Sequence, residues 1–96
     1  MKTLLLLAKG VEMMEMSVFV DVFGWARSDF GMDTQIITCG FNKQVISTFN
    51  IPITVDLTID EVNVDEYDAL AIPGGFEEFD FYKEDYDVSK WSTIKV

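Results

Sequence analysis

The sequence predicts an α/β fold in which helices pack against a parallel sheet, and two observations support this prediction. Residues 3–8 form a continuous apolar run that ends at Lys9-Gly10, which is typical of a strand buried on both faces. A helical pattern follows, and a second strand pattern runs from Asp33 to Thr38 and ends at Cys39-Gly40. A strand, a helix and a strand in that order form a right-handed crossover, so the first two strands should be parallel.

The helix is predicted to begin at about Glu12 or Glu15, to end at about Ser28 and to be closed by Asp29-Phe30-Gly31. Apolar residues recur in it every three to four positions, with Phe19 and Phe23 beside them, at Met14, Val18, Val22 and Trp25-Ala26. This spacing indicates an amphipathic helix whose apolar face packs against the sheet.

A short β-ribbon is predicted between the second and third main strands. Residues 45–48 and 51–55 have strand-like composition, and Phe49-Asn50 separates them. Asn50 suits a turn, and Pro52 favours an edge position because proline has no backbone N–H to donate.

The third main strand is predicted at residues 69–72, which are small and apolar. One helical turn is expected before it, within residues 58–67, with Thr58 or Asp60 as its cap. The strands near residues 3–8, 33–39 and 69–72 should lie in one sheet.

Composition restricts the class of protein. The 96 residues make one domain, and a hydrophobic content of 49% is rich enough for a core that so short a chain does not fully cover. A net charge of −10 argues against nucleic-acid binding and fits either solubility or a docking surface for a basic partner. The apolar start is too short for a signal peptide or a membrane span, so we expect a cytoplasmic protein with no membrane partner.

Cofactor and metal sites are not indicated. The chain has one cysteine and no histidine, so it has no set of cysteine and histidine ligands for zinc and cannot form an internal disulfide. It contains neither the glycine-rich dinucleotide fingerprint nor a phosphate-binding loop motif. Cys39 ends a strand with only Lys43 nearby as a basic residue, and we interpret it as a buried structural cysteine.

Two segments are candidates for chemistry because both follow a strand, and ligands bind at the carboxyl edge of open α/β sheets. The first holds Glu15, which could face inward between apolar neighbours with a raised pKa, or could simply favour the helix start. The second is Pro73-Gly74-Gly75, whose glycines permit unusual dihedral angles and close approach, as in an oxyanion site lined by backbone amides. An ordinary turn is the other reading of this segment.

Two stretches together resemble the ThiJ/PfpI family of the class I glutamine amidotransferase-like superfamily. They are Leu-Leu-Leu-Leu-Ala-Lys-Gly-Val-Glu-Met-Met-Glu at residues 4–15 and Tyr-Asp-Ala-Leu-Ala-Ile-Pro-Gly-Gly at residues 67–75. Val20-Asp21-Val22-Phe23 also resembles the family's first helix. The resemblance covers residues 1 to about 86, so the chain reads as a single domain, truncated after about residue 86, that equals the N-terminal half of a family member.

The resemblance implies a flavodoxin-like fold with a reactive cysteine on a strand-to-helix elbow. It implies that Glu15 hydrogen-bonds and tunes that cysteine, and that the amides of Gly74 and Gly75 help to form the oxyanion site. Family members include glyoxalase-like, deglycase-like, amidase- or peptidase-like and chaperone-like proteins, commonly as homodimers. A small carbonyl or amide substrate is therefore implied, with no cofactor.

The chain departs from this pattern because the family's elbow cysteine lies after a further helix and strand. Cys39 does not match that position, and no histidine is present to serve as a base. We therefore expect no catalysis from this chain alone. Three explanations remain open: a truncated enzyme, half of a split protein whose complementing C-terminal half supplies the cysteine, and a non-catalytic self-associating or chaperone-like module.

Overall fold

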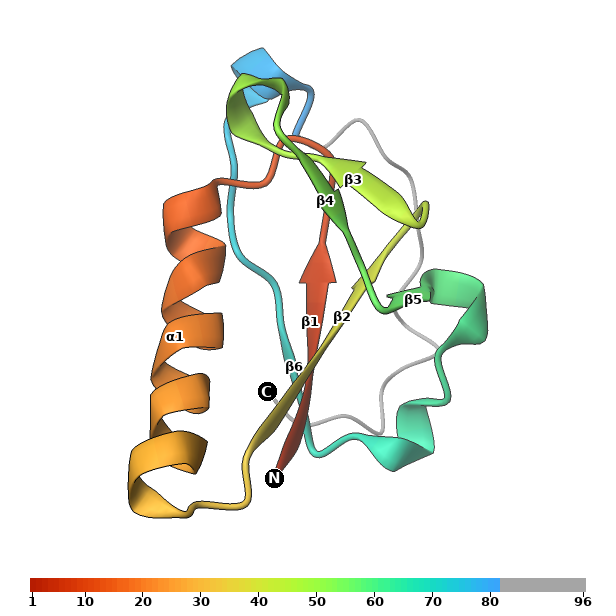
Figure 1. Ribbon diagram of the computed structural model, residues 1–96. Coiled ribbons are helices and arrows are strands. Elements are labelled where there is room, and N and C mark those ends of the chain that lie inside the picture. Colours follow the sequence, from red (N-terminus) through yellow and green to blue (C-terminus); the bar gives the residue numbers. More distant parts are fainter. Residues whose placement is uncertain (82–96) are drawn as a thin grey trace.

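The computed structural model describes residues 1–81. Six strands and one long helix succeed one another along this part of the chain (Figure 1). Their bounds are β1 Lys2–Leu7, α1 Met13–Phe30, β2 Gln35–Gly40, β3 Gln44–Ile46, β4 Pro52–Thr54, β5 Leu57–Thr58 and β6 Ala69–Ala71. Short 3₁₀ turns occupy Thr48–Asn50, Ile59–Glu61, Val64–Glu66 and Glu77–Phe79. The predicted tail after residue 86 lies outside the described residues.

The main sheet is parallel, and β1 lies at its centre. Its strand order is β5-β2-β1-β6, with β1 paired to β2 along its whole length and to β6 at Thr3–Leu5. The three predicted main strands are therefore confirmed as one parallel sheet. The pattern missed β5, which is two residues long and pairs with β2 at Cys39 and Gly40.

The core has two halves, one on each face of the sheet. Leu4 and Leu6 point to one face, where they pack with Cys39 and Tyr67. Leu5 and Leu7 point to the other face, where the cluster is completed by Val11, Val45 and Val55 and contacts α1. All four leucines are fully buried, which confirms the prediction of a strand covered on both sides.

Helix α1 is confirmed in position, but the face assigned to the sheet is wrong. Met16 and Phe19 pack on the core, and Phe23 is half-buried on the same side. Apart from the half-buried Ala26, the predicted stripe faces outward instead, with exposed fractions of 78% for Met14, 57% for Val18, 58% for Val22 and 56% for Trp25. Spacing could not distinguish the two faces because apolar residues occur on both. Within residues 1–81, no helix is long and apolar enough to cross a membrane.

Both ends of α1 are capped by a hydrogen bond. The Glu12 side chain accepts a hydrogen bond from the N–H of Met14, at 3.1 Å. At the other end, Gly31 adopts the left-handed conformation with a φ of 63° and donates its N–H to the carbonyl of Ala26. Glycine is favoured at that position because a side chain there adds steric strain.

The predicted β-ribbon is confirmed as the antiparallel pair β3–β4, with Pro52 at its start. Its connection, residues 47–51, contains two residues with positive φ, Phe49 at 55° and Asn50 at 62°. Asn50 was expected to suit a turn, whereas a bulky residue such as Phe49 is uncommon in this conformation. The hydroxyl of Ser47 donates to the carbonyl of Ile51 at 2.7 Å and holds the connection closed.

The predicted helical turn before the third strand is present as two 3₁₀ turns. Thr58 caps the first, and the Glu61 carboxylate accepts from both the N–H and the hydroxyl of Thr58, which lowers the pKa of Glu61. Asn63 caps the second by accepting from the N–H of Asp65 at 3.3 Å. The choice of Thr58 over Asp60 follows from this capping box.

Gly24, inside α1, and Gly31, the cap that follows it, allow a matched pair of stability tests. Gly31→Ala should lower the free energy of unfolding by about 1 kcal/mol, because its left-handed conformation penalises a side chain even though a Cβ there meets nothing within 4 Å. Gly24→Ala lies inside the helix in equally open space and should raise it by roughly 0.5–1 kcal/mol. Urea unfolding followed by circular dichroism measures both. Equal effects for the two variants would contradict this account of the cap.

Candidate functional site

The two segments singled out in the sequence meet at the carboxyl edge of the sheet, where β1 and β6 end side by side (Figure 1). Val11 and Gly75 form an isolated antiparallel bridge, and the N–H of Glu12 donates to the carbonyl of Gly74 at 2.8 Å. This contact joins the loop between β1 and α1 to the turn after β6. The structure thus brings Glu15, Gly74 and Gly75 to one edge of the sheet, as their positions after two strands predicted.

Gly75 is required by the protein's own backbone. A Cβ at this position would lie against the carbonyl oxygen of Gly10 and 2.6 Å from the ring of Phe81. Gly10 is equally restricted, because it has a φ of 78° and its Cβ would lie 2.8 Å from the backbone nitrogen of Phe81. The unusual dihedral angles expected at Gly74 and Gly75 are absent, since positive φ among the described glycines occurs at Gly10 and Gly31. Close packing between segments of the same chain therefore explains the glycine at position 75.

Gly74 faces the carboxylate of Glu15. A Cβ built on Gly74 would lie 3.2 and 3.4 Å from the two carboxylate oxygens. Glu15 sits in the first turn of α1, and its N–H donates to the carbonyl of Glu12 at 3.1 Å. The expectation that apolar neighbours screen Glu15 is wrong, because its side chain is exposed and Met14 points away into solvent. The carboxylate therefore lies over the Gly74 backbone, and in the described part of the chain it is exposed.

The backbone amides of this turn have no hydrogen-bond acceptor in the part of the chain that the structure describes. Gly74 and Gly75 are half-buried, and within residues 1–81 neither of their N–H groups donates a hydrogen bond. A half-buried amide without an acceptor suits an anionic oxygen. The site thus offers one carboxylate and two amide donors at the same edge.

An aromatic pair flanks the loops at this edge. The ring centroids of Phe49 and Phe79 lie 4.7 Å apart with the rings inclined at 56°. Phe49 follows Thr48, whose N–H donates to the carbonyl of Val11 at 3.0 Å. The left-handed conformation of Phe49 was not evident in the sequence, where Phe49-Asn50 indicated only a turn.

Cys39 lies away from this site and cannot act as its nucleophile. Its side chain is fully buried with Leu4 and Leu6 on the face of the sheet opposite α1. Burial raises the pKa of Cys39 to about 12, so the thiol stays protonated at neutral pH. Residues 1–81 hold no cluster of three or more groups that could bind a metal.

Comparisons with known proteins agree with this geometry. The sequence profile of the DJ-1/PfpI family matches residues 1–92. Deglycase PfpI from Pyrococcus furiosus is 48% identical over 42 residues, which are 43% of this chain and 25% of that protein. DJ-1beta from Drosophila melanogaster superposes with a TM-score of 0.65 and 27% identity, over 79% of this chain and 39% of that one.

A third protein shares the fold at lower identity. An AraC family transcriptional regulator from Pseudomonas putida superposes with a TM-score of 0.70 and 18% identity, over 78% of this chain and 47% of that one. In each of these comparisons the chain spans less than half the length of its relative.

Alkylation tests the assignment of Cys39 as structural. Iodoacetamide should modify the native protein at pH 7.5 at least about a hundredfold more slowly than the urea-unfolded chain, because only the thiolate reacts and burial keeps the thiol protonated. The native rate should rise only as the pH approaches the raised pKa of about 12. Mass spectrometry follows the modified fraction. Rapid native alkylation at neutral pH would show that Cys39 is reactive.

Proposed function

Because the chain belongs to the DJ-1/PfpI family, we propose that its sheet edge forms the acid-and-amide half of a cysteine-dependent site for a small carbonyl or amide compound. The observation that supports this is the position of the Glu15 carboxylate over Gly74, beside two amides that have no acceptor within residues 1–81. One relative with a matching region is named a deglycase, which favours a carbonyl-derived substrate here.

The chemistry assigns a separate role to each group. A thiol donates its proton to the Glu15 carboxylate, and the thiolate sulfur attacks the carbonyl carbon. The electron pair of the C=O bond moves onto oxygen, which then accepts hydrogen bonds from the N–H groups of Gly74 and Gly75. Each such donor typically contributes a factor of about 10²–10³ in rate.

The thiol has to come from another segment, because the 96 residues contain no cysteine besides the buried Cys39. Strand β6 ends the described sheet, and its outer edge has no partner strand within residues 1–81. A complementing C-terminal half can add its strand there and present a cysteine at the same carboxyl edge. A reduced thiol fits a cytoplasmic location.

Self-association is the second candidate function, and the outward face of α1 favours it. We define the outer stripe as Met14, Val18, Val22 and Trp25, which are all more than half exposed. The stripe is nearly symmetric about position 20, since Val18 and Val22 lie two residues to either side. Two antiparallel copies of α1 can therefore place Val18 of one copy against Val22 of the other across a two-fold axis.

A fusion protein tests the catalytic proposal. We expect the 96-residue chain to consume methylglyoxal no faster than buffer. Residues 1–81 fused to the C-terminal half of the Pyrococcus furiosus deglycase should consume it measurably, because the fusion supplies the thiol. Glu15→Gln in the fusion should lower kcat/KM by about 10²–10⁴, whereas Glu77→Gln, an exposed carboxylate outside the proposed site, should stay within about twofold of the parent. A folded fusion without activity, or one unaffected by Glu15→Gln, contradicts the proposal.

Light scattering tests the self-association proposal on the chain as it is. The protein should have the mass of a dimer, and Val18→Glu should shift it to the monomer mass, because the two-fold contact would bury two carboxylates beside apolar side chains. Phe30→Glu changes an exposed apolar residue outside the outer stripe and should leave the mass unchanged. A monomeric parent, or dissociation by Phe30→Glu alone, would eliminate the outer stripe as the contact.

A further inference from the structure

Strand β2 has an unpaired stretch on the side away from β1. Strand β5 pairs with it only at Cys39 and Gly40, so within residues 1–81 no strand pairs with Gln35–Ile37 on that side. The N–H of Gln35 donates to the carbonyl of Met1 at 2.8 Å. Because hydrogen-bonding direction alternates along a strand, the N–H and the carbonyl of Ile36 point outward.

Thr38 is the next residue of β2 whose N–H points outward, and this N–H already donates a hydrogen bond within the chain. The Asp56 carboxylate accepts from the N–H of Thr38 at 2.9 Å and from its hydroxyl at 3.0 Å. A carboxylate that satisfies an edge N–H is one way in which proteins block strand addition. Within the described residues, this edge is therefore protected at Thr38 and unpaired at Ile36.

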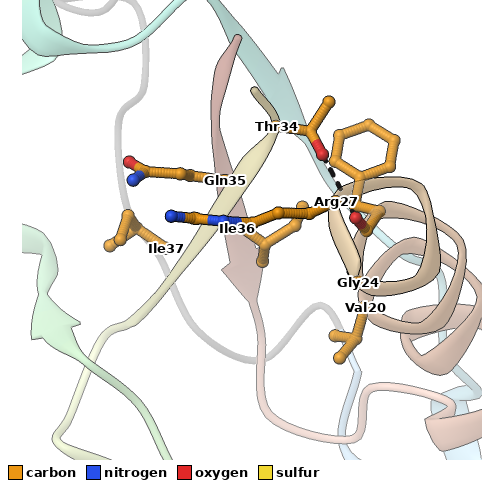
Figure 2. A pocket seen from close by; sticks show the side chains of 8 residues that line it. Val20, Gly24, Arg27, Thr34, Gln35, Ile36 and Ile37 are labelled. Carbon is orange, nitrogen blue, oxygen red and sulfur yellow. Dashed lines mark hydrogen bonds between the residues drawn. The ribbon is translucent and has the colours of Figure 1, made fainter. Parts of the chain in front are cut away.

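A groove of about 340 Å³ runs beside the open stretch, between β2 and the second half of α1 (Figure 2). Its walls combine apolar side chains, among them Val20 and Phe23 from α1 and Ile36 from β2, with polar ones. Gly24 leaves room in the wall, since a Cβ there would meet nothing within 4 Å. The hydroxyl of Thr34 is already engaged, because it donates to the carbonyl of Phe23 at 3.1 Å.

Arg27 supplies a positive charge to this groove. Its side chain extends from α1 across β2 toward Gln35 and Ile37 (Figure 2). The ion pairs within residues 1–81 join Lys2 to Glu66 and Lys9 to Asp80, so none involves Arg27, although the protein is strongly acidic. A guanidinium prefers the two-pronged geometry of a carboxylate, and the exposed Arg27 can reach one on a bound segment.

We propose that this groove binds an extended, largely apolar peptide segment of a partner protein that carries one carboxylate side chain. The segment adds as a short strand to β2 and pairs with the N–H and carbonyl of Ile36. Alternate side chains of an added strand point to the same face, so a central carboxylate reaches Arg27 while the apolar residues two positions away contact Val20 and Phe23. The short open edge predicts a weak and reversible contact.

A fluorescein-labelled peptide of sequence Val-Thr-Glu-Thr-Val tests the proposal by anisotropy titration of the 96-residue chain. Its two valines and its glutamate share one face. We expect saturable binding, weakened about three- to tenfold by a Glu-to-Gln peptide and by Arg27→Gln. The two changes should not add, because each removes the same ion pair.

Two further measurements locate the contact. Gly24→Leu should abolish binding by filling the groove, while circular dichroism shows α1 intact. In ¹⁵N spectra the peptide should shift the amide of Ile36, and N-methylation of the peptide backbone should remove the effect. No saturable binding at millimolar peptide, equal affinity for the Gln peptide, or shifts confined to β6 would each overturn the proposal. The proposal would also be overturned if a second copy of the chain occupied this edge and the peptide did not displace it.

Discussion

The complete burial of β1 is the constraint on which the rest of this structure depends. Leu4, Leu5, Leu6 and Leu7 are all removed from solvent, and each contributes roughly 1.5–3 kcal/mol of hydrophobic stabilisation. A buried backbone needs hydrogen-bond partners on both edges, which β2 and β6 supply, and apolar cover on both faces. The helix α1 covers one face, and Ile59, Tyr67 and Leu70 help to cover the other.

The candidate site follows from the same constraint. Because β1 and β6 are parallel neighbours, both end at one edge, and the segments that leave them must cross there. The crossing of Gly10 over Gly75 is so close that neither position accepts a side chain. This contact holds the start of α1 in place, and with it the carboxylate of Glu15 beside Gly74. The geometry needed for chemistry is thus a by-product of how the central strand is packed.

Much of this arrangement could be predicted from the sequence, and the failures have physical reasons. The run at residues 4–7 indicated a fully covered strand, and the position of Glu15 and Gly74 after two such strands placed them on one edge. The inward face of α1 could not be predicted because Met14 and Val18 form a stripe as apolar as that of Met16 and Phe19. The sequence suggested a close approach at position 75 but left an ordinary turn open, and the groups that approach it, the ring of Phe81 and the Gly10 carbonyl, are known only from the structure. The short strand β5 depends on pairing rather than on its own pattern.

The pairing of β1 with β6 also bears on how the chain is made. Lys2 donates its N–H to the carboxylate of Asp68, a contact between residues 66 positions apart. On the ribosome β1 is synthesised before both of its neighbours, and β6 is the last of the described strands to emerge. At about 5–20 residues per second, the four leucines wait roughly 3–13 seconds for that edge to be paired. Contacts of such long range also slow folding, and pairing with β2, which is synthesised earlier, can protect one edge of this apolar segment in the meantime.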